Sequence, residues 1–181
     1  MGVVYLIPSM LHEDGLNAIP AYILAAIKNC QVFFAENERT TRRYFKQLWK
    51  EMVIDDYEWY TIDENSGGKF KSLLKEEKNI GIISEAGCPG VADPGQSLIA
   101  LAQEMKITIH PLVGPNSILL ALMASGMNGQ QFQFVGYLPI DNQQRVKTIK
   151  ELEAESCRKN CTQIFIETPY RNNHLIDALL K

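Results

Sequence analysis

Long apolar runs are missing from this sequence. No stretch approaches the ~18 consecutive apolar residues that a membrane span needs. The first residues carry no basic segment and meet Pro8 too soon for a secretory leader, so they resemble a strand instead. Hydrophobic residues make up 46% and charged residues 22%, as in folded globular proteins. These observations predict a cytoplasmic protein with no membrane partner.

Metal-binding patterns and a strong basic charge are missing as well. Of the four cysteines only Cys157 and Cys161 lie close together, and no second cysteine or histidine pair completes a zinc site. We therefore expect free thiols and no metal centre. The net charge is −3, so no global basic field indicates nucleic-acid binding, although a local basic patch is not excluded.

What the sequence does have is an alternation of short β-branched runs with helical patterns. Strands alternating with helices predict an α/β fold with a parallel sheet and right-handed crossovers. Residues 79–84, apolar apart from their ends, are typical of a central strand buried on both faces. Five strands are expected in the first half, at residues 3–7, 31–35, 53–62 (ambiguous), 79–84 and 107–112. The helical patterns there cover residues 16–27, 38–50, 70–77 and 96–105, with a loop at 65–68.

A turn and helix cap at residues 114–117 predicts a domain junction, with domains at 1–113 and 114–181. The second part continues with helices at 118–125, 143–153 and 172–180 and strands at 132–138 and 162–167. Two strands make a poor sheet for a stable domain, and Lys181 falls inside an apolar helical pattern without a cap. We therefore expect the native polypeptide to continue and this chain to be truncated.

The segment that follows the central strand, residues 84–95, holds three glycines and two prolines among twelve residues. It lies at the carboxyl end of a parallel strand, where open α/β sheets bind ligands. Glycine lets a ligand approach the backbone, and proline lowers the entropic cost of an open loop. A tight connection without a ligand is the alternative, but such connections are usually shorter. The loop therefore favours a small-ligand site.

Two nucleotide-binding motifs are absent. The sequence has no G-x-x-x-x-G-K-[ST], which excludes P-loop phosphate chemistry. It also has no G-x-G-x-x-G after the first strand, where Pro8, Ser9 and Met10 stand, so a classical dinucleotide fold is not expected. The residues alone therefore predict an α/β enzyme with a small ligand and leave its identity open.

Five motifs in register resemble the tetrapyrrole (corrin/porphyrin) methylase superfamily, and within it the branch of ribosomal RNA small-subunit 2′-O-methyltransferases. The loop EAGCPGVADPG at 85–95 is similar to that branch's DAGTPGISDPG. The other matches are AEN at 35–37 with the arginines after it (AEDTR), GPNS at 114–117 (GPSA), FQFVGYLP at 132–139 (FxFxGFLP) and ETPYR at 167–171 (ESPHR). The resemblance covers nearly the whole chain.

The resemblance implies a homodimeric two-domain enzyme whose cofactor, S-adenosyl-L-methionine, binds in the cleft between two α/β domains. Some positions depart from the branch pattern. Residues 8–14 replace the usual PTPIGN segment, Asn37 and Glu85 stand where the branch has aspartate, and Cys88 replaces a threonine. Several of these changes fall where an acceptor would lie, so a divergent paralogue with another substrate stays open.

By resemblance, the cofactor would contact the backbone of the loop, the cleft floor, the interdomain linker and the second domain. Ser117 could equally be a plain helix N-cap. A ribose hydroxyl profits from a general base, and Glu36 and Asp93 are the catalytic candidates. Asp93 could simply cap the next helix, and Glu36 could be an ion-pair partner of Arg39 or Arg43. The expected cofactor-binding residues are Pro8, Gly87, Cys88, Pro89, Gly90, Val91, Ser117, Ile118 and Glu167.

A basic helical run contains Arg39, Arg42, Arg43 and Lys46. It is either a solvated helix face or a contact for phosphate, joined by Arg171. We take the three arginines and Arg171 as substrate-binding candidates. His12, a lone loop histidine, is an outside catalytic candidate.

The leading hypothesis is an S-adenosylmethionine-dependent methyltransferase acting on RNA of the small ribosomal subunit, at a ribose 2′-oxygen. An alternative keeps the cofactor and methylates a small-molecule tetrapyrrole. A third, of another class, is a cofactor-binding module that has lost catalysis, which the changes at Asn37 and Cys88 leave open.

Overall fold

A computed structural model describes residues 2–180 of the chain. It divides into two compact units, Met1–Ser117 and Ile118–Lys181. The predicted helical pattern at Lys181 lies outside the described residues. Within residues 2–180, no helix combines the length and the apolar character that crossing a bilayer would require.

The first unit is built on a five-stranded sheet in the order β3-β2-β4-β1-β5. All four neighbouring pairs are parallel, which confirms the predicted parallel α/β sheet. The central strand β4 is buried along its whole length, as its uninterrupted apolar sequence predicts. The strands are β1 (Val3–Ile7), β2 (Val32–Ala35), β3 (Glu58–Thr61), β4 (Ile80–Ile83) and β5 (Thr108–Pro111).

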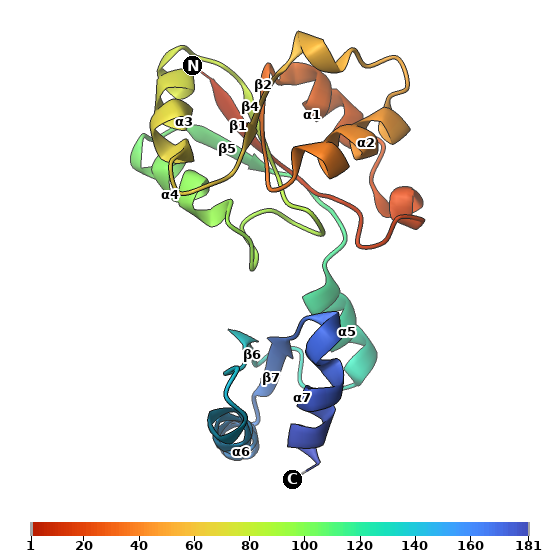
Figure 1. Cartoon of the computed structure of the whole chain (residues 1–181), viewed down its shortest axis with the longest axis vertical. Helices are drawn as coiled ribbons and strands as arrows, with labels where there is room; N and C mark the ends of the chain where they lie inside the picture. Colours follow the sequence, from red (N-terminus) through yellow and green to blue (C-terminus); the bar gives the residue numbers. More distant parts are fainter. Residues whose placement is uncertain (1, 181) are drawn as a thin grey trace. The chain divides into compact units, whose positions relative to one another are not determined.

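Helices cover both faces of this sheet (Figure 1). Phe34 and Ile82 pack on one side in a cluster with Phe70 and Leu98, which come from α3 (Ser66–Lys75) and α4 (Gln96–Glu104). On the other side Phe33 belongs to a second cluster, formed with α1 (Ile23–Asn29) and α2 (Glu38–Leu48). Neighbouring strand residues point to opposite faces, so Phe33 and Phe34 serve different cores.

The connections that follow β1, β2 and β4 create a switch point at the carboxyl ends of these strands. The chain leaves β1 and β2 toward the face covered by α1 and α2, and leaves β4 toward the face covered by α3 and α4 (Figure 1). Because β4 lies between β1 and β2, the chain after β4 crosses to the opposite face of the sheet from the chain after either neighbour. Open α/β sheets bind ligands at such a switch point.

Two predicted segments of the first unit are wrong. The pattern at 16–27 is split into a 3₁₀ turn (Gly15–Ala18) and α1, because Pro20 has no N–H for a continuous helix. The expected loop at 65–68 is mostly helix, since α3 begins at Ser66. The Ser66 hydroxyl donates to Thr61 O at 3.0 Å and holds the chain at the end of β3. A further 3₁₀ turn, Ile54–Asp56, occupies the start of the ambiguous stretch 53–62.

The second unit contains a two-stranded parallel sheet of β6 (Phe132–Tyr137) and β7 (Thr162–Ile166). Its register shifts between Phe134 and Gly136, where Gly136 adopts a φ of +73°. The helix predicted at 143–153 is longer than expected and ends at Lys159, before Asn160, whose left-handed φ of 50° terminates it. The other elements are α5 (Ser117–Ser125), α6 (Asn142–Lys159), a 3₁₀ turn (Pro169–Arg171) and α7 (Asn172–Leu179).

Candidate active site

The glycine–proline loop after β4 is anchored at its start to the segment after β1. Ser9 and Gly87 exchange backbone hydrogen bonds, Ser9 N to Gly87 O at 2.8 Å and Gly87 N to Ser9 O at 3.2 Å. The Ser9 hydroxyl donates to Ser84 O at 2.7 Å. Gly87 takes a φ of +76°, a left-handed conformation that favours glycine. The carboxyl ends of the adjacent strands β1 and β4 are therefore locked together.

Asp93 fixes the far half of the same loop. Its Oδ1 accepts hydrogen bonds from Gly90 N at 2.8 Å and from Gly95 N at 3.0 Å, so one carboxylate oxygen brackets the turn. Its Oδ2 is buried without a hydrogen-bond partner. Burial raises the pKa of Asp93 above its ordinary value, and the nearby Glu36 carboxylate raises it further. The loop keeps its shape through its own contacts.

A second pair of contacts packs residues 114–116 against this loop. A Cβ at Gly114 would stand 2.1 Å from Pro8 Cβ, so only glycine permits this close approach. The Cys88 thiol contacts the carbonyl oxygens of Gly114 and Pro115 at 3.7 and 3.6 Å. Burial raises the pKa of Cys88, which keeps the thiol neutral. Cys88 therefore serves as a packing and hydrogen-bonding group here.

Glu36 links two strand ends. It follows β2 directly, and its Oε2 accepts a hydrogen bond from Glu85 N at 2.8 Å. Its own N–H donates to Ile83 O at 3.1 Å, which extends the ladder between β2 and β4 by one residue. Oε2 of Glu36 thus holds the start of the loop in place, and Oε1 takes no part in that contact. The ion pair with Arg39 or Arg43 that the sequence left open is not formed among residues 2–180.

The arginines of α2 fall into different environments. Asn37 caps the helix, its Oδ1 accepting from Arg39 N and Thr40 N at 3.1 and 3.3 Å. Arg42 pairs with Glu38 at 2.7 Å, and its guanidinium lies 5.0 Å from the centre of the Trp59 ring. Arg39 and Arg43 are exposed. The predicted basic run therefore divides into one paired arginine and two exposed ones.

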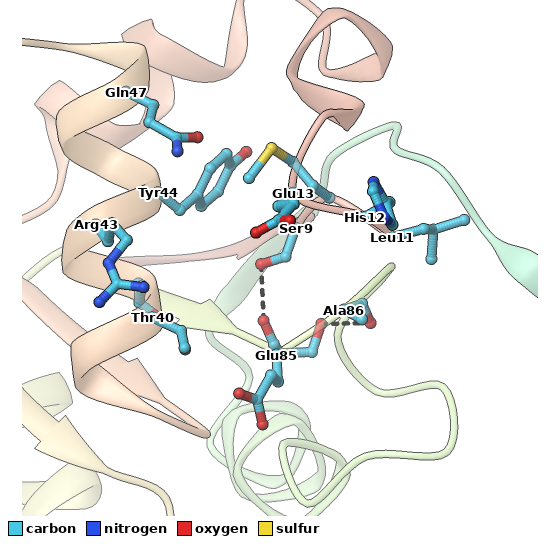
Figure 2. Close-up of a pocket in the computed structure, with 13 residues that line it drawn as sticks. Ser9, Leu11, His12, Glu13, Thr40, Arg43, Tyr44, Gln47, Glu85 and Ala86 are labelled. Carbon is cyan, nitrogen blue, oxygen red and sulfur yellow. Dashed lines mark hydrogen bonds between the residues drawn. The ribbon is translucent and has the colours of Figure 1, made fainter. Parts of the chain in front are cut away.

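A cavity of about 400 Å³ opens beside this basic helix, within the first unit. We call it the α2 pocket. Figure 2 shows side chains from α2 on one side of it, the segment after β1 on another, and the start of the loop after β4 below. Its lining residues are 9–13, 84–86 and Thr40, Thr41, Arg43, Tyr44 and Gln47.

The structure brings some of the predicted site residues together and leaves others apart. Pro8, Gly87, Cys88 and Gly90 lie in one bonded cluster, and Val91 is 44% exposed at the open side of the loop. Of the predicted site residues only Arg43 lines the α2 pocket, together with His12, the outside candidate. The sequence analysis missed Ser9, Glu13 and Gln47. No motif marked them, although their place at a strand end or on a helix beside the switch point was a usable signal.

The remaining candidates lie at the start of α5 and in the second unit. Ser117 is the first residue of α5, followed by Ile118. Glu167 has a side chain only 3% exposed, and its Oε1 accepts from Thr168 N at 2.8 Å and pairs with Arg171 Nε at 3.0 Å. Glu167 Oε2 is buried without a partner. Arg171 is therefore committed in part to Glu167.

Comparisons with known proteins agree with this architecture. No family model matches the sequence. The chain is 33% identical over 179 residues to ribosomal RNA small subunit methyltransferase I of Bacillus subtilis, covering 99% of the chain and 59% of that protein. It is 31% identical to the protein of the same name from Micromonospora olivasterospora, over 94% of the chain and 52% of that protein. The crystal structure of the methyltransferase CobJ has the same fold, with a TM-score of 0.62 and 15% identity over 99% of this chain and 74% of that one.

The chain is therefore similar along nearly its whole length to ribosomal RNA small subunit methyltransferases, and it has the fold of CobJ. The predicted α/β fold is confirmed, and so is the resemblance to ribosomal RNA small subunit methyltransferases that the five motifs indicate. The chain spans little more than half the length of the two bacterial relatives that it matches. The similarity to CobJ, at 15% identity, concerns the fold alone.

Proposed function

We propose that this protein is an S-adenosylmethionine-dependent methyltransferase that modifies RNA of the small ribosomal subunit at a ribose 2′-oxygen. The observation that carries this proposal is the 33% identity to the Bacillus subtilis ribosomal RNA methyltransferase along 99% of the chain. The anchored loop at the switch point of the sheet supports it independently, because ligands of α/β enzymes bind there. A cytoplasmic location and a homodimer belong to the same proposal and rest on resemblance.

The loop fits an adenosyl cofactor. Gly87 and Gly90 have left-handed φ values of +76° and +84°, and a Cβ at Gly90 would meet Ile99 Cδ1 at 2.8 Å. The side chains between them are small, so a ligand can reach the backbone of this loop. When bound, S-adenosylmethionine would supply an electrophilic methyl group. In the proposal it is held by Pro8, Gly87, Cys88, Pro89, Gly90 and Val91, with Ser117, Ile118 and Glu167.

Of the two catalytic candidates, the geometry favours Glu36. Asp93 already accepts two backbone hydrogen bonds through Oδ1, and its Oδ2 is buried. Glu36 uses only one of its oxygens for Glu85 N and is partly exposed, which leaves the other able to accept a proton from a ribose hydroxyl. Asp93 would then be a positioning residue that shapes the cofactor loop.

Two measurements test the proposal. Calorimetry with S-adenosylmethionine and S-adenosylhomocysteine should show binding of both, and failure of both would overturn it. Incubation with radiolabelled cofactor and either small ribosomal subunits or a precorrin should label only the RNA. Label that enters only the ring compound would instead establish tetrapyrrole methylation.

A further inference from the structure

Side chains that donate and side chains that accept hydrogen bonds both line the α2 pocket. Thr40 and Gln47 line it from α2, Glu13 from the segment after β1, and Glu85 from the loop after β4. Figure 2 shows the Arg43 side chain on the helix side of the same space. Its volume of about 400 Å³ lies within the range of small-ligand sites, about 300–1,000 Å³. The pocket therefore suits a small ligand with both donors and acceptors.

The charged side chains that line the α2 pocket limit the chemical class of ligand that it can bind. Two carboxylates, Glu13 and Glu85, line it against one guanidinium, Arg43. Both glutamates are exposed, and no ion pair among residues 2–180 neutralises either of them. Carboxylates repel phosphates and the acidic side chains of a tetrapyrrole, and they accept hydrogen bonds from amino groups. An uncharged heterocycle that carries an exocyclic amino group matches this arrangement.

The inner wall of the pocket is rigid. Ser9 is 5% exposed, and its hydroxyl and backbone are bonded to Ser84 and Gly87. The Tyr44 hydroxyl donates to Pro8 O at 2.9 Å, which ties α2 to the same segment. The Glu85 backbone is held by Glu36. A ligand would therefore enter a preformed wall, which lowers the entropic cost of binding.

We propose that the α2 pocket receives an unpaired nucleobase with an exocyclic amino group, taken from the RNA strand that the enzyme methylates. Glu13 and Glu85 accept hydrogen bonds from that amino group, and Arg43 and the exposed Arg39 lie on the same helix to contact flanking phosphates. Single-stranded RNA is read in this way, through splayed bases. This inference rests on the proposed function and adds a site for the acceptor strand.

The experiment compares short single-stranded RNAs on the purified protein. Affinities for the pentanucleotides oligo(A), oligo(C) and oligo(U) are measured by fluorescence anisotropy, because uracil lacks an exocyclic amino group. We expect oligo(A) or oligo(C) to bind about ten-fold more tightly than oligo(U). In the Glu13→Ala/Glu85→Ala double variant, which removes both acceptors, this ratio should fall toward one. The ratio is insensitive to a general loss of folded protein.

The matched control is Glu104→Ala, which removes a carboxylate from an exposed site on α4, away from the pocket. It should keep the wild-type ratio. Equal binding of all three oligonucleotides by the wild type, or a ratio that the double variant leaves unchanged, overturns the pocket assignment. So does tighter binding of uroporphyrin III by the double variant, since it would mean that the carboxylates were excluding an acidic macrocycle from its own site.

Failure of the pocket and failure of the proposed function are separable. S-adenosylmethionine binding and RNA labelling by the wild-type protein report on the proposed function alone. If both are present and the oligonucleotide ratio is one, only the pocket assignment is wrong. If both are absent, the methyltransferase proposal fails, and the oligonucleotide ratio still reports whether the pocket selects a base.

Discussion

The carboxylate of Glu36, at the end of β2, accepts a hydrogen bond from the backbone N–H of Glu85, at the start of the loop after β4, at 2.8 Å. This contact joins two strand ends that are 49 residues apart in sequence. It gives one carboxylate two separable tasks in the proposed enzyme, positioning the loop with one oxygen and accepting a proton with the other.

Glu36→Gln separates these two tasks. The amide oxygen can still accept from Glu85 N, so the free energy of unfolding should fall by less than about 1 kcal/mol. Because an amide cannot act as a base, methyl transfer to small ribosomal subunits should fall by about 10²-fold or more. Urea unfolding and a labelled-cofactor assay measure the two quantities. Activity close to that of the wild type would show that Glu36 only positions the loop.

Asp93→Asn tests the buried carboxylate through pH. The folded-state pKa of Asp93 is raised above the ordinary 3.8, so folding favours the protonated form. That stabilisation is present below about pH 3.8 and is lost as the pH rises through the raised value. The neutral variant lacks this loss, so its unfolding free energy relative to wild type should increase with pH from 3.8 upward and then level off. Urea unfolding of both proteins between pH 4 and 7 measures this difference in unfolding free energy. A difference that does not change with pH would contradict the raised pKa of Asp93.

Gly114→Ala tests the close approach to Pro8. The added Cβ would stand 2.1 Å from Pro8 Cβ, and the proline ring cannot rotate away. We expect a loss of about 1–3 kcal/mol in the free energy of unfolding. Gly68→Ala is the matched control, because nothing lies within 4 Å of its Cβ and the residue is in α3. It should gain about 0.5–1 kcal/mol. Equal stability of both variants would argue against tight packing at Gly114.

Arg43→Ala and Arg42→Ala should differ in their effect on RNA binding. Arg43 is exposed at the α2 pocket, so its removal should lower the slope of log affinity against log salt by about one unit. Arg42 is paired with Glu38 and covers Trp59, so its removal should mainly cost stability and change the slope less. Filter binding of small-subunit RNA across a salt series measures both slopes. Identical slopes for the two variants would contradict the assignment of Arg43 to RNA binding and of Arg42 to stability.

The elements of the fold were largely predictable because they depend on local periodicity. The strand at 3–7 was placed at its observed bounds, and α4 to within one residue at its end. The errors came from local chemistry that competes with periodicity. Pro20 interrupts one helix, and Ser66 starts another inside a segment that its glycines marked as a loop.

The α/β alternation, the position of the glycine–proline loop and the resemblance to ribosomal RNA methyltransferases could all be predicted from neighbouring residues, because each is a local pattern. The roles of the individual side chains of the site could not, because they depend on the folded chain. Ser9 meets Ser84 across 75 residues, and Arg42 and Arg43 differ because one faces Glu38 and Trp59 while the other faces the α2 pocket. Such roles depend on contacts between distant segments, and these contacts exist only once the sheet has brought its strand ends together.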